Sequence, residues 1–118
     1  MFDAFIQGNS MSQHRKVAVL CRVEPGCLGP DGREHIEAFC ALAQQAMKHF
    51  AADVVTWTLV PRYDKTLPEM EYSVANKSLS RTQVTQYFNT LGQDVDAFEE
   101  AFNDKLTAFI NLYLARKS

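Results

Sequence analysis

Two short β-type runs separated by a polar loop constrain this fold more than any other feature. Residues 54–60 read VVTWTLV and residues 70–74 read MEYSV; both alternate large apolar side chains with small or polar ones. Such alternation gives a strand one apolar and one polar face, so helices are expected to cover only one side of the sheet. The loop between them, residues 61–69, holds two prolines and several charges. The stretch therefore predicts an antiparallel hairpin at the centre of a small sheet.

Residues 16–24, KVAVLCRVE, predict a first strand. Val17, Val19, Cys21 and Val23 would share one face, and the run is rich in β-branched side chains. Its near absence of polar residues is typical of a strand inside a sheet rather than at its edge.

Three helices are expected after this strand. Asp31 and Glu34 fit a capping box, which predicts a helix starting near Gly32 or Arg33. Its apolar stripe repeats at three- and four-residue steps: Ile36, Phe39, Cys40, Ala43, Met47 and Phe50. Ser80 and Gln83 form a second capping box, and that helix stops at Gly92. A last helix runs from about Asp94 almost to the end, with an acidic start and a basic end.

The expected order is β-α-β-β-α-α in a single α+β domain of residues 16–118, preceded by an arm of residues 1–15. A strand–helix–strand crossover is right-handed and makes the first two strands parallel. The third strand is predicted between them, giving the order 1-3-2. This arrangement resembles a three-stranded ferredoxin-like split unit whose fourth strand is replaced by a helix.

Composition excludes several classes of protein. The 118 residues are 47% hydrophobic and 22% charged, which is typical of a globular domain. The net charge is −2 and the basic residues are scattered, so nucleic acid is not expected as a partner. The chain has no apolar run long enough for a transmembrane helix. Three cysteines without a CxxC pair predict free thiols and a cytoplasmic location.

Two loops carry the candidate chemistry, residues 25–32 and 61–69. If the first two strands are parallel, both loops leave the same edge of the sheet, where ligand sites of α/β sheets commonly lie. Cys27, close to a helix N-terminus, is a candidate nucleophile with His35 as its base. The alternative is that Cys27 packs under its loop and His35 is solvated in the first helical turn.

An anionic ligand is the second possibility at this edge. Arg62 would grip a carboxylate or phosphate, with Tyr63 stacking and Lys65 adding positive charge. Asp31 and Asp64 belong to the same predicted ligand site. Alternatively, Arg62 and Lys65 pair with nearby acids and only stiffen the loop. Cys27, His35 and Cys40 are too irregularly spaced for a metal site, and no cofactor motif is present.

Without a catalytic motif, the sequence favours a self-associating or partner-binding module over an enzyme. The last helix has more apolar surface than one contact stripe needs, because Leu112 and Leu114 flank its core residues. One edge and one face of the sheet are also expected to be uncovered. A homodimer would bury such surfaces, unless the N-terminal arm covers them. The alternative function is a small anion-binding protein or thiol-dependent enzyme using the two loops.

Overall fold

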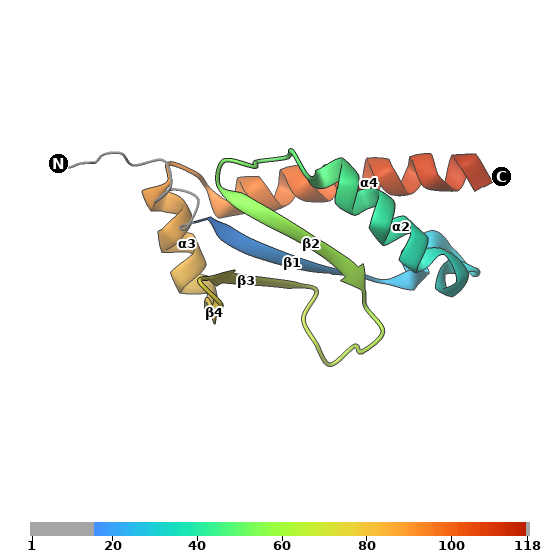
Figure 1. The fold of residues 1–118 in the computed structure, drawn as a ribbon, viewed down its shortest axis with the longest axis horizontal. Coiled ribbons are helices and arrows are strands. Elements are labelled where there is room, and N and C mark those ends of the chain that lie inside the picture. The colour runs from blue at the N-terminus through green and yellow to red at the C-terminus, as the bar shows by residue number, and fades with distance from the viewer. Residues whose placement is uncertain (1–15, 118) are drawn as a thin grey trace.

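A four-stranded mixed sheet carries three α-helices on one face in the computed structural model, which describes residues 16–117 (Figure 1). The strands, in the spatial order β2-β1-β3-β4, are β1 (Val17–Val23), β2 (Val55–Pro61), β3 (Met70–Val74) and β4 (Lys77–Ser78). The helices are α2 (Gly32–Met47), α3 (Arg81–Thr90) and α4 (Val95–Lys117), and a short 3-10 turn, η1 (Pro25–Leu28), links β1 to α2. The predicted α+β class is confirmed. The predicted arm, residues 1–15, lies outside the described residues.

The predicted helix starts are confirmed, but α2 ends at Met47, which leaves Phe50 of the predicted stripe in the following turn. Only one of the two capping boxes forms. At α3, the Gln83 N–H donates to the Ser80 hydroxyl and the Gln83 side chain accepts from the Ser80 N–H. At α2, Asp31 makes no side-chain cap, because its backbone (φ −94°, ψ 16°) is not in the extended conformation of an N-cap. The Glu34 N–H instead donates to the Asp31 carbonyl at 3.0 Å.

The strand order is the main correction to the sequence prediction. β1 and β2 are parallel, as expected, with Val17 opposite Val55 and Val23 opposite Pro61. However, β3 pairs antiparallel with the other side of β1, so the predicted three-stranded ferredoxin-like order 1-3-2 is wrong. Residues 54–74 are therefore not a hairpin. β1 is the interior strand, as its lack of polar residues indicated.

The loop of residues 62–69 makes this order possible. It has to pass the end of β1 to join two strands that lie roughly 10 Å apart, a span well within the reach of eight residues. Hydrogen bonds hold it there: the Arg62 N–H donates to the Val23 carbonyl at 2.8 Å, and the Arg22 N–H donates to the Glu69 carbonyl at 2.7 Å. The end of β1 is thus clamped from both sides.

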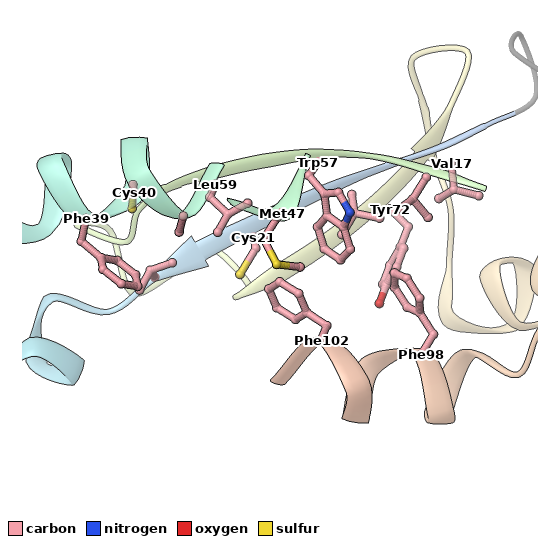
Figure 2. Packing of buried hydrophobic residues seen from close by; sticks show 14 of the residues in the cluster. Val17, Cys21, Phe39, Cys40, Met47, Trp57, Leu59, Tyr72, Phe98 and Phe102 are labelled. Atoms are coloured by element: carbon pink, nitrogen blue, oxygen red, sulfur yellow. The ribbon is translucent and has the colours of Figure 1, made fainter. Parts of the chain in front are cut away.

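The hydrophobic core fills the space between the covered sheet face and the helices (Figure 2). The predicted inward faces of the strands are confirmed, since β1 and β2 alternate buried and more exposed residues from their first position. Trp57 stacks on Phe102 of α4 with ring centroids 4.7 Å apart, and Phe98 stacks on the same indole at 5.5 Å. These aromatic contacts pack the first half of α4 against β2.

Both edges of the sheet are shielded. Gln44 on α2 acts on β2 like a strand partner: its Nε2 donates to the Trp57 carbonyl at 2.7 Å, and its Oε1 accepts from the Leu59 N–H at 2.8 Å. Pro61, the next outward position on β2, has no N–H to offer. At the other edge, β4 is only two residues long. Short or capped edges resist pairing with further strands.

The opposite sheet face is covered by none of the described helices. Its residues are mostly small or polar, such as Ala18, Thr56 and Thr58. At one end Arg22 forms an ion pair with Glu71 and donates to the Pro68 carbonyl. Such a face is typical of the solvated side of a sheet. Within residues 16–117, none of the helices has the length and apolarity needed to cross a membrane.

Candidate functional site

The two predicted loops do meet at one end of the sheet, here called the loop rim (residues 24–32 and 62–69). Because β1 and β2 run parallel, their following loops leave the same edge. Arg62 bonds to Glu24 across the rim at 3.0 Å. The rim encloses a hollow of about 280 Å³ lined by Glu24, Pro25, Gly26, Gly29, Pro30, Gly32, Arg33, Arg62, Tyr63 and Lys65.

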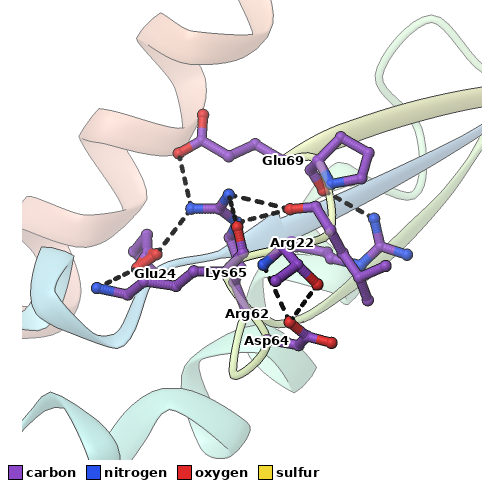
Figure 3. Close-up of polar contacts among 9 residues, drawn as sticks. Arg22, Glu24, Arg62, Asp64, Lys65 and Glu69 are labelled. Carbon is purple, nitrogen blue, oxygen red and sulfur yellow. Dashed lines mark hydrogen bonds and ion pairs between the residues drawn. The ribbon is translucent and has the colours of Figure 1, made fainter.

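Arg62 is the centre of the rim, and its guanidinium faces inward (Figure 3). Nε and one terminal nitrogen donate to the Leu67 carbonyl at 3.1 and 2.9 Å, and the same terminal nitrogen donates to the Lys65 carbonyl at 3.1 Å. The other terminal nitrogen binds Glu24 at 3.0 Å and lies 3.9 Å from Glu69. This set of contacts uses the planar donor fork of arginine to hold the loop in shape.

The other predicted ligand residues of this loop also have local partners. Asp64 accepts from the N–H and the hydroxyl of Thr66, and these hydrogen bonds hold the pKa of its carboxyl below the ordinary value. The Tyr63 hydroxyl donates to Glu37 on α2 at 3.0 Å. Lys65 lies 3.8 Å from Glu24, but its side chain is 77% exposed.

Cys27, Asp31 and His35 are not brought together into one site. Cys27 is exposed on η1, and the residues that line the hollow do not include it. His35 packs the edge of its ring against Tyr113 of α4, with centroids 6.1 Å apart. Asp31 is exposed at the start of α2 and does not line the hollow either.

The remaining thiols are part of the core. Burial raises the pKa of Cys21 to about 12 and that of Cys40 to about 11, so both stay protonated at neutral pH. All three cysteines are free. Within residues 16–117, no cluster of three or more His, Cys, Asp or Glu side chains is arranged to hold a metal ion.

A second surface lies between α2 and the C-terminal half of α4, here called the α2–α4 groove. Its hollow of about 230 Å³ is lined by Phe39, Leu42, Ala43, Ala46, Phe109, Leu112, Tyr113 and Arg116. The two helices run antiparallel: Phe50, just after α2, stacks on Phe98, whereas Phe39 meets Tyr113 with centroids 5.5 Å apart.

Two leucines of the α2–α4 groove are left in contact with solvent. Leu42 is 55% exposed and Leu112 is 62% exposed, the largest values among the exposed large hydrophobic residues of the described chain. Single exposed leucines are ordinary, but two around one apolar hollow form a patch. Arg116 is the charged residue of the lining. The groove is therefore an apolar surface that water reaches.

Of the two exposed leucines in this groove, the sequence alone identified one. Leu112 stood out because it lies beside the core stripe of the last helix. Leu42 was missed, although it is a large apolar residue off the stripe of α2, and this departure from amphipathic order was the available signal. What sequence could not supply was the antiparallel packing that places Leu42 beside Leu112.

A second polar cluster, separate from the loop rim, joins β3, α3 and α4. Glu99 accepts hydrogen bonds from the Tyr72 hydroxyl and from Arg81, and Arg81 also binds Asp96 at 2.6 Å. Burial alone would raise the pKa of Glu99, but the hydrogen bonds from Arg81 and Tyr72 outweigh burial and lower it. Burial and the Glu99 contact raise the pKa of Tyr72. The cluster pins the start of α4 to the sheet.

Comparison of the chain with protein-family models, with curated proteins and with solved structures gave no match.

Proposed function

We propose that this chain is a non-catalytic binding module that self-associates through the α2–α4 groove. The observation that carries the proposal is the pair of exposed leucines, Leu42 and Leu112, on one apolar hollow. Burying such a patch against a second surface removes apolar area from water, which is the main driving force of protein association. With three free cysteines in the chain, the reducing cytoplasm is the compartment that we propose.

Other surfaces are poorer candidates for the interface. The sheet edges are shielded by Gln44, by Pro61 and by the shortness of β4. The uncovered sheet face carries threonines and an ion pair, and water can hydrogen-bond to these polar groups. Among the described residues, the groove carries the two most exposed large hydrophobic side chains around one mainly apolar hollow.

The test is a charged substitution in the groove. Leu112→Glu would put a carboxylate into the apolar contact, and we expect it to raise the dimer dissociation constant by roughly a hundredfold. Light scattering or sedimentation across a concentration series would measure this change.

Leu67→Glu is the matched control, because Leu67 is 41% exposed but lies in the loop rim. That variant should associate like the wild type. A wild-type chain that stays monomeric at high micromolar concentration would remove the proposal.

A second candidate function is anion binding at the loop rim. It is supported by two exposed basic residues, Arg33 and Lys65, around one hollow next to the start of α2. Here Arg62 would serve as scaffold rather than as ligand, since its contacts are internal. A thermal-shift series with phosphate, sulfate and small carboxylates tests this function. Stabilisation that survives the double substitution R33A and K65A would contradict it.

Thiol chemistry at the same rim would depend on Cys27, the exposed cysteine of the described chain. Alkylation by a small probe at neutral pH measures its reactivity. A nucleophilic role requires a rate well above that of an unperturbed thiol. A rate equal to that of a free thiol would eliminate a catalytic Cys27.

A further inference from the structure

The outer face of α4 has the pattern of a helix that pairs with a copy of itself. On successive turns it presents Ala97, Ala101, Lys105, Ala108, Leu112 and Arg116, all of them exposed. The steps of three or four residues keep these side chains on one side of the helix. This face borders the α2–α4 groove, whose lining includes Leu112 and Arg116.

The exposed charges of α4 differ in sign between its two ends. Asp94, Glu100 and Asp104 are exposed in or just before its first half, and Arg116 is exposed near its end. Asp96 and Glu99 are committed elsewhere, since both bind Arg81. The helix is therefore acidic at one end of its outer face and basic at the other.

We propose that two copies of the chain pair their α4 helices antiparallel, with Asp94 of each copy facing Arg116 of the other. This inference rests on the proposed function, because it names the partner of the α2–α4 groove as a second copy and gives its direction. A parallel pair would set Arg116 against Arg116 and Asp94 against Asp94, which is repulsive at both ends.

Side-chain size supports the same direction. If the two-fold axis passes between Asp104 and Lys105, Leu112 of one copy lies opposite Ala97 of the other, Ala108 lies opposite Ala101, and Arg116 lies within one residue of the position opposite Asp94. Small residues facing a large one let two helices approach closely and fill the groove without overlap. Asp104 of one copy then lies across the axis from Lys105 of the other. Within each chain, the Lys105 ammonium group lies 5.2 Å from the Phe50 ring centroid.

A double-mutant cycle tests the pairing. Asp94 also accepts from the Ala97 N–H at 3.3 Å as a helix cap, so Asp94→Asn keeps the cap and removes only the charge. We expect Asp94→Asn and Arg116→Gln each to raise the dimer dissociation constant by roughly three- to tenfold. The double variant should be no weaker than either single variant.

Non-additive effects of substituting Asp94 and Arg116 on dimerisation would have one physical source. Within a copy they are 22 positions apart, about 33 Å along the helix, which exceeds the screening length of physiological salt. Only contact between copies can couple them. Additive effects of the two substitutions would overturn the antiparallel pairing.

Cross-linking gives a second readout. In a Cys27→Ser background, a chain with both Ala101→Cys and Ala108→Cys should form an intermolecular disulfide under mild oxidation. Neither single variant should do so, because in an antiparallel pair each of these positions lies away from the same position in the other copy. If both single variants cross-link, the pair is parallel and the inference fails.

The outcomes separate the inference from the proposed function. A dimer that Leu112→Glu disrupts, but that shows no Asp94–Arg116 coupling and no cross-link in the double-cysteine chain, keeps the groove as the interface and overturns the antiparallel arrangement. A wild-type chain that is monomeric at high micromolar concentration overturns both.

Discussion

The loop rim and the α2–α4 groove are opposite kinds of surface. The rim has the more reactive composition, with arginine, lysine, tyrosine and carboxylates around one hollow. However, most of these groups are used internally: Arg62 alone contacts Glu24 and the carbonyls of Lys65 and Leu67. The groove has one charged residue in its lining, but the side chains of Leu42 and Leu112 are exposed to solvent in the described part of the chain. What a surface can bind depends on which groups the fold leaves unsatisfied rather than on which groups are present.

The largest effect should come from the backbone contact under the rim. A Cβ added at Gly32 would lie 1.8 Å from the Pro25 carbonyl oxygen and 2.6 Å from its carbon. Neither atom can move without displacing η1 or α2. We expect Gly32→Ala to lower the free energy of unfolding by about 3 kcal/mol in chemical denaturation, although alanine is normally the better helix former.

Gly26→Ala is the matched control, because Gly26 lines the same hollow and has nothing within 4 Å of its added Cβ. It should change the stability by less than about 0.5 kcal/mol. Equal effects of the two substitutions would mean that Gly32 is not tightly packed against the Pro25 carbonyl.

The structural role of Arg62 predicts the next effect. Arg62→Ala removes the donors to two carbonyls and leaves Glu24 without its closest cation, so we expect a loss of about 2 kcal/mol in the free energy of unfolding. Lys65→Ala, which removes one long and exposed ion pair, should lose less than about 0.5 kcal/mol. If the two variants are equally stable, Arg62 is not the scaffold of the rim.

Much of the fold was accessible from sequence, but the strand order was not. The strand and helix positions follow from apolar periodicity and from one working capping box, at Ser80 and Gln83. The placement of β3 depends on the path of residues 62–69. That path is fixed where Arg22 donates to the Pro68 and Glu69 carbonyls and the Arg62 N–H donates to the Val23 carbonyl, and local sequence does not encode such distant contacts. For the candidate sites, sequence located the shared rim and Leu112. It offered internal pairing of Arg62 as one of two alternatives without deciding between them, and it could not show that Leu42 meets α4.

A smaller effect is expected at the shielded edge of β2. Gln44→Ala removes a donor to the Trp57 carbonyl and an acceptor for the Leu59 N–H. We expect a loss of about 1–1.5 kcal/mol in thermal or chemical unfolding, together with slow aggregation at high concentration through the opened edge. The exposed neighbour provides the control, and Gln45→Ala should change neither quantity. Unchanged aggregation in Gln44→Ala would mean that this edge needs no such cover.

The smallest effect is a pH dependence from the cluster that anchors α4. The pKa of Glu99 is lowered in the folded chain, so its contribution to stability is complete above the ordinary value of 4.5 and is lost as the pH falls through the lower folded value. We therefore expect Glu99→Gln to flatten the acid limb of the stability–pH curve below about pH 4.5. An acid limb identical to that of the wild type would show that the Arg81 and Tyr72 contacts do not stabilise the ionised form.

The most direct test of the central claim is the mass in solution of three chains: wild type, Leu112→Glu and Leu67→Glu. Sedimentation equilibrium at high micromolar concentration should give twice the 13.4 kDa chain mass for the wild type and for Leu67→Glu, and the single mass for Leu112→Glu. A single mass for the wild type, or a Leu112→Glu chain that dimerises as well as the wild type, would contradict the assignment of the α2–α4 groove as the binding surface.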